Sequence, residues 1–499
     1  MIIAVFIILF AIFPLTDTDI WWHLACAREW VTTWTPVRTP VVNVHEYFQL
    51  VVGFIYGLGG APLLVAFKAF LWGVVFALFL RPRHAARHAE RHAARHPELV
   101  SGSASASPAK WVLCLAFLFI FRYQFEMRPV LFSLLFLGVY WNVLPWLAKE
   151  WRESRFSVKL MACTVLILAI QWLWCKCQGL YILGPIFATL VLCANLLESK
   201  KQRALRVKFA LPQVAFVLLL WTMPFLHQEG LALFLYPFGL LDRLLGLTPS
   251  AVVFASQIAE NRSPITLLVA GENRIVSAAM IVLSFAGMGL AAWRLYKARR
   301  PDVLNVTLLV TASLALIAER NFVLFLPVFL AMLPTFSKQP KVATSSLIPR
   351  VHLPTVYCLL PTFFILGLWA RSLSAYDYSM VAYQRVPVQA AEWMAKHPHS
   401  GKLFNDDRAG GYLALMNPAD SIYIDGRFIL KTADFFERYL DYAKDPALFM
   451  HDADSLGIDR ALFPLQYYAR WDELMLALNQ DSRWHLVYRD EYFAVFDKF

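Results

Sequence analysis

Two carboxylates lie one residue apart near the start of the chain, in the segment DTDIWWHL at positions 17–24. A carboxylate can act as a general base, and two together can ligate a hard divalent cation such as Mg²⁺ or Mn²⁺. The two tryptophans that follow are typical of the membrane–water interface and would hold the acids at headgroup depth. Asp17 and Asp19 are therefore candidate catalytic residues or metal ligands, and His23 is a candidate substrate-binding residue. The alternative is the ordinary start of a solvated loop.

Cationic residues near the ends of apolar runs are candidates for binding a phosphate-bearing substrate, because such a substrate needs compensating positive charge. They are Arg122, Arg128, Lys176, Arg262 and Arg320. Arg128 and Arg320 are the strongest candidates, because aromatic and apolar neighbours surround each of them. Every one of these side chains can instead snorkel to lipid headgroups. The segment ENRSP at positions 260–264 is either a lid over the site or a plain connector.

Two short motifs near the C-terminus add further candidates. Gly410-Gly411 would allow a close backbone approach, or would form a turn that opens a helix. Asp425-Gly426-Arg427 follows a strand-like run, and α/β domains place ligand-binding loops after strands. Asp425 and Arg427 are therefore candidate substrate-binding residues. The alternative is a structural Asp–Arg network that fixes tight turns.

Apolar runs dominate the first 370 residues. The whole chain is 59% hydrophobic and only 16% charged, whereas a soluble domain has about a quarter charged residues. Eleven runs approach the length of about 20 residues that crosses a bilayer. They start near Ile2, Pro62, Trp111, Val130, Leu160, Leu180, Ala210, Arg274, Val303, Phe322 and Thr355. Residues 1–370 are thus predicted to form a polytopic α-helical membrane domain with about eleven transmembrane helices.

The segments between these runs alternate in charge. One set is basic, namely 81–110, 149–159, 200–208, 294–300 and 338–350, and the other is mixed or acidic, namely 16–46, 122–128, 174–179, 227–272 and 319–321. The positive-inside rule then places the N-terminus in the cytoplasm and the C-terminal region outside, which in a bacterial inner membrane means the periplasm. Residues 81–110 form a low-complexity insertion in a cytoplasmic loop. This scattered positive charge is not a basic face for nucleic acid.

Residues 376–499 have the composition of a water-soluble domain. Strand-like runs (KLFN, SIYID, WHLVYRD, YFAVFD) alternate with helix-like stretches (PVQAAEWMAKH, DFFERYLDYAKD, WDELMLALN). This alternation predicts a small α/β domain with a mainly parallel sheet that ends in an antiparallel hairpin.

The acidic motif in the first outer loop, the many spans and the extracytoplasmic C-terminal domain resemble the GT-C superfamily of integral membrane glycosyltransferases. The chain is similar to bacterial members that open with D-x-D-x-W-W-H-L and carry G-G-Y-L and D-G-R near the C-terminus, here at positions 410–413 and 425–427. Arg128-Pro129 and Arg320-Asn321 also resemble that group. One departure is Lys176-Cys177-Gln178-Gly179, where relatives have an Asn-x-His-Gly-type turn.

The resemblance implies an enzyme that moves a sugar from a polyprenyl-phosphate donor to a glycan, lipid or protein acceptor at the outer face, with inversion. Asp17 or Asp19 would be the base, or would ligate a divalent cation. Two other functions remain open, namely a transporter or flippase of lipid-linked glycans and a non-catalytic scaffold that binds envelope glycans. The chain shows no internal repeat of the kind that transporters carry, and most ionisable residues lie near span ends, which disfavours transport.

Overall fold

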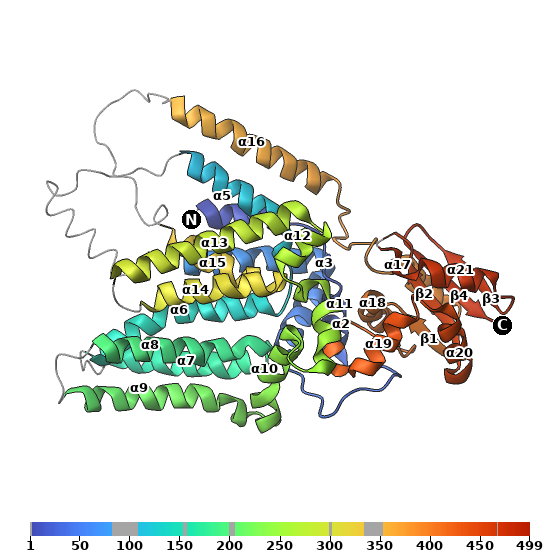
Figure 1. Ribbon diagram of the computed structural model, residues 1–499, viewed down its shortest axis with the longest axis horizontal. Helices are drawn as coiled ribbons and strands as arrows, with labels where there is room; N and C mark the ends of the chain where they lie inside the picture. Colours follow the sequence, from blue (N-terminus) through green and yellow to red (C-terminus); the bar gives the residue numbers. More distant parts are fainter. Residues whose placement is uncertain are drawn as a thin grey trace.

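The computed structural model describes residues 2–81, 108–152, 157–198, 205–298, 302–333, 353–466 and 468–499. A bundle of roughly parallel helices occupies most of the molecule, and a small domain that contains the C-terminus sits at one end of it (Figure 1). Most of the predicted low-complexity insertion, residues 82–107, lies outside the described residues, as does the basic segment 338–350.

Helices form at all eleven places where the apolar runs predict them. They are α1 (Ile2–Phe10), α3 (Glu46–Phe79), α5 (Pro108–Ile120), α6 (Val130–Arg152), α7 (Val158–Cys175), α8 (Leu183–Glu198), α9 (Leu205–Thr222), α13 (Arg274–Ala298), α14 (Val303–Ile317), α15 (Phe322–Met332) and α16 (Leu353–Ser374). Helix α3 begins well before the expected start at Pro62, because a kink at Gly59 and Gly60 joins two helices, with Gly60 at a φ of 63°.

Five helices among the described residues are long and apolar enough to cross a membrane. They span Glu46–Phe79, Val130–Trp151, Val158–Cys175, Gly179–Leu196 and Arg274–Lys297, and a sixth span is counted if the bent pair Ala210–Leu226 and Gly230–Leu245 is taken as one. Length and composition thus identify a polytopic membrane protein.

Shorter helices gather at the end of the bundle that faces the C-terminal domain (Figure 1). They are α2 (Asp19–Arg28), α10 (Gly230–Leu245), α11 (Val252–Gln257) and α12 (Pro264–Ala270), with the 3₁₀ turns η2 (Arg122–Gln124), η3 (Gly179–Ile182), η5 (Met223–Leu226), η6 (Pro249–Ala251), η7 (Ala259–Asn261) and η8 (Glu319–Asn321). Most of these elements come from the five segments with mixed or acidic charge, so those segments meet at one end, as the charge alternation predicts.

The C-terminal domain packs helices around a four-stranded sheet. Its strands are β1 (Lys402–Asn405), β2 (Ile458–Pro464), β3 (Trp484–Arg489) and β4 (Phe493–Lys498), and its helices and turns are α17 (Val388–Lys396), α18 (Asp407–Met416), η10 (Phe428–Leu430), α19 (Ala433–Asp441), α20 (Pro446–Leu456), η11 (Ala469–Trp471) and α21 (Asp472–Gln480). The strand order is β1-β2-β4-β3. Strand β1 runs parallel to β2, while the β2–β4 and β3–β4 pairs are antiparallel. The predicted hairpin is confirmed, but the expectation of a mainly parallel sheet is wrong.

The strand-like run SIYID (421–425) does not join the sheet. The Asn405 side chain bonds the Tyr423 amide at 2.8 Å and the Ile424 carbonyl at 2.8 Å, which ties the run to the end of β1. Its backbone pairs instead with the first outer loop, through a bridge between Thr33 and Ile422 and a bond from the Trp34 amide to the Ile422 carbonyl of 3.1 Å. The loop therefore completes the domain at this edge.

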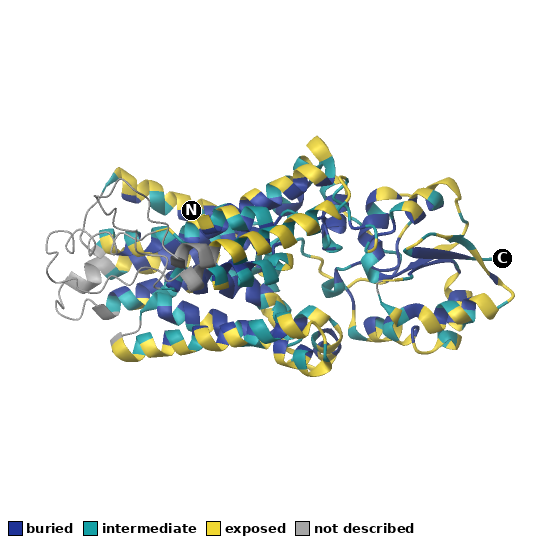
Figure 2. Cartoon of the chain, turned by 90° about the horizontal axis from the view of Figure 1, so that it is seen from above, coloured by how far each residue is buried: buried dark blue, intermediate teal, exposed yellow. Residues whose placement is uncertain are grey.

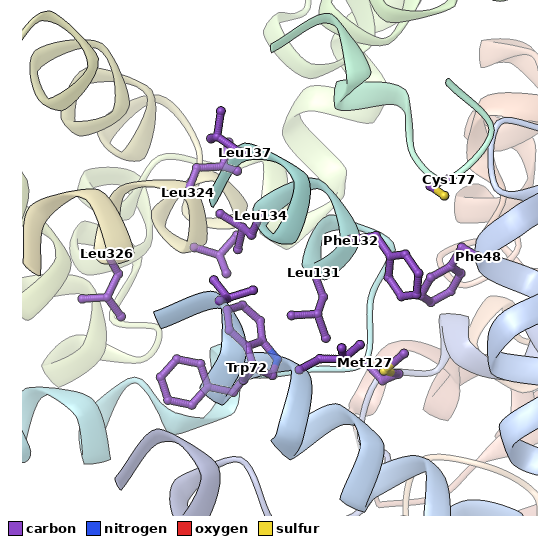
Figure 3. Close-up of a cluster of buried hydrophobic side chains, with 14 of the residues drawn as sticks. Phe48, Trp72, Met127, Leu131, Phe132, Leu134, Leu137, Cys177, Leu324 and Leu326 are labelled. Atoms are coloured by element: carbon purple, nitrogen blue, oxygen red, sulfur yellow. The ribbon is translucent and has the colours of Figure 1, made fainter. Parts of the chain in front are cut away.

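Buried residues lie inside the bundle and in the middle of the C-terminal domain, while the outer helix faces carry exposed residues (Figure 2). In the bundle, Phe48 of α3 meets Phe132 of α6 edge to face, with ring centroids 5.3 Å apart (Figure 3). Trp72 of α3 donates its indole N–H to the Glu126 carbonyl at 3.1 Å. This packing fixes the turn between η2 and α6, where Arg128 lies.

Candidate active site

Asp17 is buried in the segment between α1 and α2, two residues before α2, and accepts two hydrogen bonds from Arg128. The guanidinium Nε is 2.8 Å from Asp17 Oδ2, and Nη2 is 3.1 Å from Asp17 Oδ1. A two-point contact of this kind combines charge with fixed geometry. It ties the first outer loop to the start of α6.

Glu260 of η7 holds the opposite edge of the same guanidinium. Arg128 Nη1 lies 2.8 Å from Glu260 Oε2, and Nη2 lies 2.6 Å from Glu260 Oε1. Burial opposes the charge on Glu260, but the Arg128 cation, with Arg320 and Arg385 nearby, outweighs burial and lowers the pKa of Glu260 to about 2. Glu260 therefore ties the segment 260–264 to the start of α6.

Asp19 differs from Asp17 in having no ion pair with Arg128. It is the first residue of α2, and its amide donates to Asp17 Oδ1 at 3.3 Å. Burial and the neighbouring Asp17 carboxylate together raise the pKa of Asp19 to about 7. Asp19 can therefore exchange a proton near neutral pH.

Glycines of the C-terminal domain lie directly against Asp19 and α2. A Cβ on Gly426 would lie 1.9 Å from Asp19 Oδ1. On α18, a Cβ on Gly411 would lie 2.8 Å from the Trp22 amide nitrogen, and one on Gly410 would lie 1.9 Å from the Ile424 carbonyl oxygen. Gly410-Gly411 lies inside a helix and permits a close approach, so the alternative of a turn that opens the helix is wrong. Both C-terminal motifs therefore meet the first outer loop.

Asp425 and Arg427 form a buried ion pair beside this contact. Arg427 Nε lies 3.0 Å and 2.9 Å from the two Asp425 carboxylate oxygens. The guanidinium carbon also lies 5.6 Å from the Trp22 ring centroid and 5.0 Å from that of Trp30. The pair thus lies against α2 and the residues that follow it.

The other predicted binding residues lie around this group. Arg320 donates to Asn261 Oδ1 of η7 at 3.0 Å. Lys176 pairs with Glu46 at 2.8 Å and also with Glu229, so it ties the α7–α8 turn to α3 and α10. His23 is buried with its ring centroid 3.5 Å from that of Trp22, and burial holds its pKa well below the usual range, so the imidazole is neutral. Arg320 touches η7 directly, whereas Lys176 belongs to a neighbouring cluster.

Two buried ionisable residues beside Asp17 were not predicted from the sequence. Glu126 accepts a bond from the Thr16 hydroxyl, and burial raises its pKa. Lys68, in α3, donates to the Phe13 carbonyl at 3.1 Å. A charged residue within an apolar run is itself a functional signal, so Lys68 was the member of this pair that the sequence could have revealed.

A divalent cation held by Asp17 and Asp19, as the sequence suggested, would have to share Asp17 with Arg128. Both oxygens of Asp17 and both of Glu260 accept bonds from Arg128. Within the described part of the chain, no three His, Cys, Asp or Glu side chains are grouped as metal ligands. The single positive charge of Arg128 balances only one of these two carboxylates.

No protein-family model matches the chain, and no curated protein matches it in sequence. The fold is similar to that of an oligosaccharyltransferase from Archaeoglobus fulgidus. The structure of that protein tethered with an acceptor peptide containing the NVT sequon via a disulfide bond gives a TM-score of 0.51 at 12% identity, covering 93% of this chain and 68% of the other. The apo form gives a TM-score of 0.50 at the same identity and coverage.

This similarity shows the fold alone, which is like that of the archaeal oligosaccharyltransferase. The fold that the sequence resemblance implied is therefore confirmed. The roles of individual residues rest on the site geometry, because fold alone does not fix function.

Proposed function

We propose that the protein is a GT-C-type glycosyltransferase that moves a sugar from a polyprenyl-phosphate donor to an envelope acceptor. The observation that carries this proposal is the position of Asp19. It is a half-buried carboxyl with a pKa near 7, enclosed by the first outer loop and the DGR motif, at the end of a membrane bundle of this fold. A general base works best when its pKa lies near the working pH.

In the proposed reaction, Asp19 takes the proton from the acceptor's nucleophilic atom. That atom attacks the anomeric carbon of the sugar, and the bond from this carbon to the phosphate oxygen breaks, so the configuration inverts. Arg320 lies close enough to lower the pKa of Glu260 and supplies positive charge for the departing phosphate. Arg128 holds Asp17 and Glu260 in place and thereby positions α2 and η7.

The proposed setting is a bacterial inner membrane, crossed about eleven times, with the N-terminus in the cytoplasm and the C-terminal domain in the periplasm. The charge alternation supports this orientation, because the described helix ends that flank the predicted basic segments lie at the end of the bundle away from the domain (Figure 1). The acceptor is a glycan, lipid or protein. The acceptor peptide of the structural neighbour supports a protein acceptor.

The test compares Asp19→Asn, Asp17→Asn and the double variant in a deletion strain. Asp302→Asn is the matched control, because Asp302 caps α14 through the Asn305 amide and lies in none of the contacts described above. Mass spectrometry of envelope glycolipids and glycoproteins identifies the sugar that the deletion removes, and immunoblots measure the protein. We expect Asp19→Asn to lower transfer by about 10²-fold or more with normal protein levels. Normal transfer by both single variants and the double variant would refute the proposal.

A further inference from the structure

Helix α10 leaves the bundle at a steep angle. The axis of Gly230–Leu245 is bent by 104° from that of Ala210–Leu226, which contains most of α9. The helix lies across the end of the bundle next to the C-terminal domain, nearly at right angles to α7 and α9 (Figure 1). If α9 crosses the membrane, α10 therefore lies along its surface.

One face of α10 is apolar and exposed. Its members are Leu231, Leu235, Phe238, Leu241 and Leu245, which are between 38% and 60% exposed. Their spacings of three and four residues place them in one stripe along the helix. A contiguous apolar stripe of this length on an outer face marks a surface that is covered in the working protein.

The opposite face of α10 is fixed to protein. The Leu233 carbonyl accepts a bond from the Tyr181 hydroxyl. Arg243 donates to the Phe428 carbonyl at 2.7 Å and to the Lys431 carbonyl at 2.8 Å, both in the C-terminal domain. These bonds set the rotation of the helix about its axis and leave the apolar stripe pointing away from the molecule.

The stripe continues the outer surface of α9. That surface has its own exposed apolar residues, which are Leu211, Leu218, Leu219, Phe225 and Leu226. The ring centroids of Phe225 and Phe234 lie 5.1 Å apart, so the two surfaces join at the bend. The two exposed apolar surfaces therefore meet through this aromatic pair, while the chain at the bend itself is polar, with Gln228 exposed between Leu226 and α10.

We propose that α10 is an interfacial helix whose apolar stripe is embedded in the outer leaflet of the membrane. The stripe contacts the acyl chains and headgroups of the lipid. An amphipathic helix binds such a surface through its buried apolar area and through attraction to anionic lipids. Because no basic residue lies in the stripe, the helix binds uncharged lipid as well as anionic lipid.

The segment that follows α10 reaches the candidate active site. Beyond α10, Phe254 of α11 stacks on Phe436 of the C-terminal domain with centroids 5.1 Å apart, and η7 then brings Glu260 to Arg128. One continuous segment thus connects the membrane surface, the C-terminal domain and the site. This inference requires only that α9 crosses a membrane, so it holds whether or not sugar is transferred.

The test uses the full chain in nanodiscs of phosphatidylcholine. The photoreactive residue p-benzoylphenylalanine replaces Leu235 or, as a matched control, Leu476, an exposed leucine of α21 in the C-terminal domain. After illumination, mass spectrometry detects lipid adducts, and size-exclusion chromatography checks the fold of each variant. We expect adducts at position 235 and at least about tenfold fewer at 476. Equal yields, or protein–protein adducts in place of lipid adducts at 235, would overturn the proposal.

Discussion

At the scale of single residues, Asp17 and Asp19 are neighbours with different surroundings. Asp17 is bonded twice to Arg128, while Asp19 faces Gly426 and has a pKa near 7. The sequence made both acids candidate site residues but did not distinguish their roles, because Arg128, the partner of Asp17, lies 111 positions away. Their difference depends on long-range contacts that no local pattern encodes.

Proton transfer by Asp19 predicts a pH dependence. Because its pKa is raised to about 7, the carboxyl is protonated below that pH and cannot accept a proton. We expect transfer to rise with pH and to level off above about pH 8. The measurement is the initial transfer rate in membranes between about pH 5 and pH 9. A rate that stays constant from pH 5 to pH 7 would exclude Asp19 as the base.

Gly426 predicts a steric effect on the same acid. In Gly426→Ala, the new Cβ would lie 1.9 Å from Asp19 Oδ1, so the carboxyl or the DGR loop must move. We expect transfer to fall by about tenfold to a hundredfold, as misplacement by about 1 Å does in other enzymes. The matched control is Gly289→Ala in α13, where a Cβ meets nothing within 4 Å. Equal activity of the two variants would show that Asp19 tolerates displacement.

At the scale of elements, apolar runs located the helices, and a change of composition located the C-terminal domain. The sheet was less predictable, because strand direction depends on pairing partners. Only β1 and β2 are parallel, and the run at 421–425 bonds to the first outer loop. The position of η7 was equally hidden, since Glu260 lies in a short polar turn that resembles many connectors.

Replacing Lys431 tests the contact between the first outer loop and the C-terminal domain. Its buried ammonium bonds Thr33 Oγ1 at 2.8 Å and Thr35 Oγ1 at 2.6 Å. Lys431→Met leaves these groups without their partner, which costs about 1–3 kcal/mol for a buried group. We expect faster tryptic cleavage after the exposed Arg38 and a lower melting temperature. Lys444→Met is the control, because the Lys444 side chain is 79% exposed, and an identical response of the two variants would contradict the assignment.

At the scale of the whole molecule, the charge alternation predicted correctly that the mixed segments meet at one end. Hydropathy and charge suffice for this because they act on whole segments. They do not reveal that Arg128 lies between Asp17 and Glu260, or that the C-terminal domain touches α2. Those features depend on side chains that approach within a few ångströms.

The orientation in the membrane gives a prediction at this scale. Alkaline phosphatase is active only where its disulfides form, outside the cytoplasm. We expect high activity when it is fused after Phe499 and low activity when it is inserted within residues 81–110. Immunoblots control for the level of each fusion. The reverse pattern would contradict the proposed topology, because the candidate active site would then lie on the cytoplasmic side, away from a periplasmic substrate.

The bond between Lys431 and Thr35 joins residues 396 positions apart. During synthesis, the first outer loop enters the membrane region early, and domains fold largely in the order in which they emerge from the ribosome. The loop must therefore wait until the chain has grown by these 396 positions before its partner exists. Asp19 meets Gly426 only at that last stage. A chain that stops early would keep both acids yet lack the enclosure around them, so biosynthesis itself would delay activity until the protein is complete.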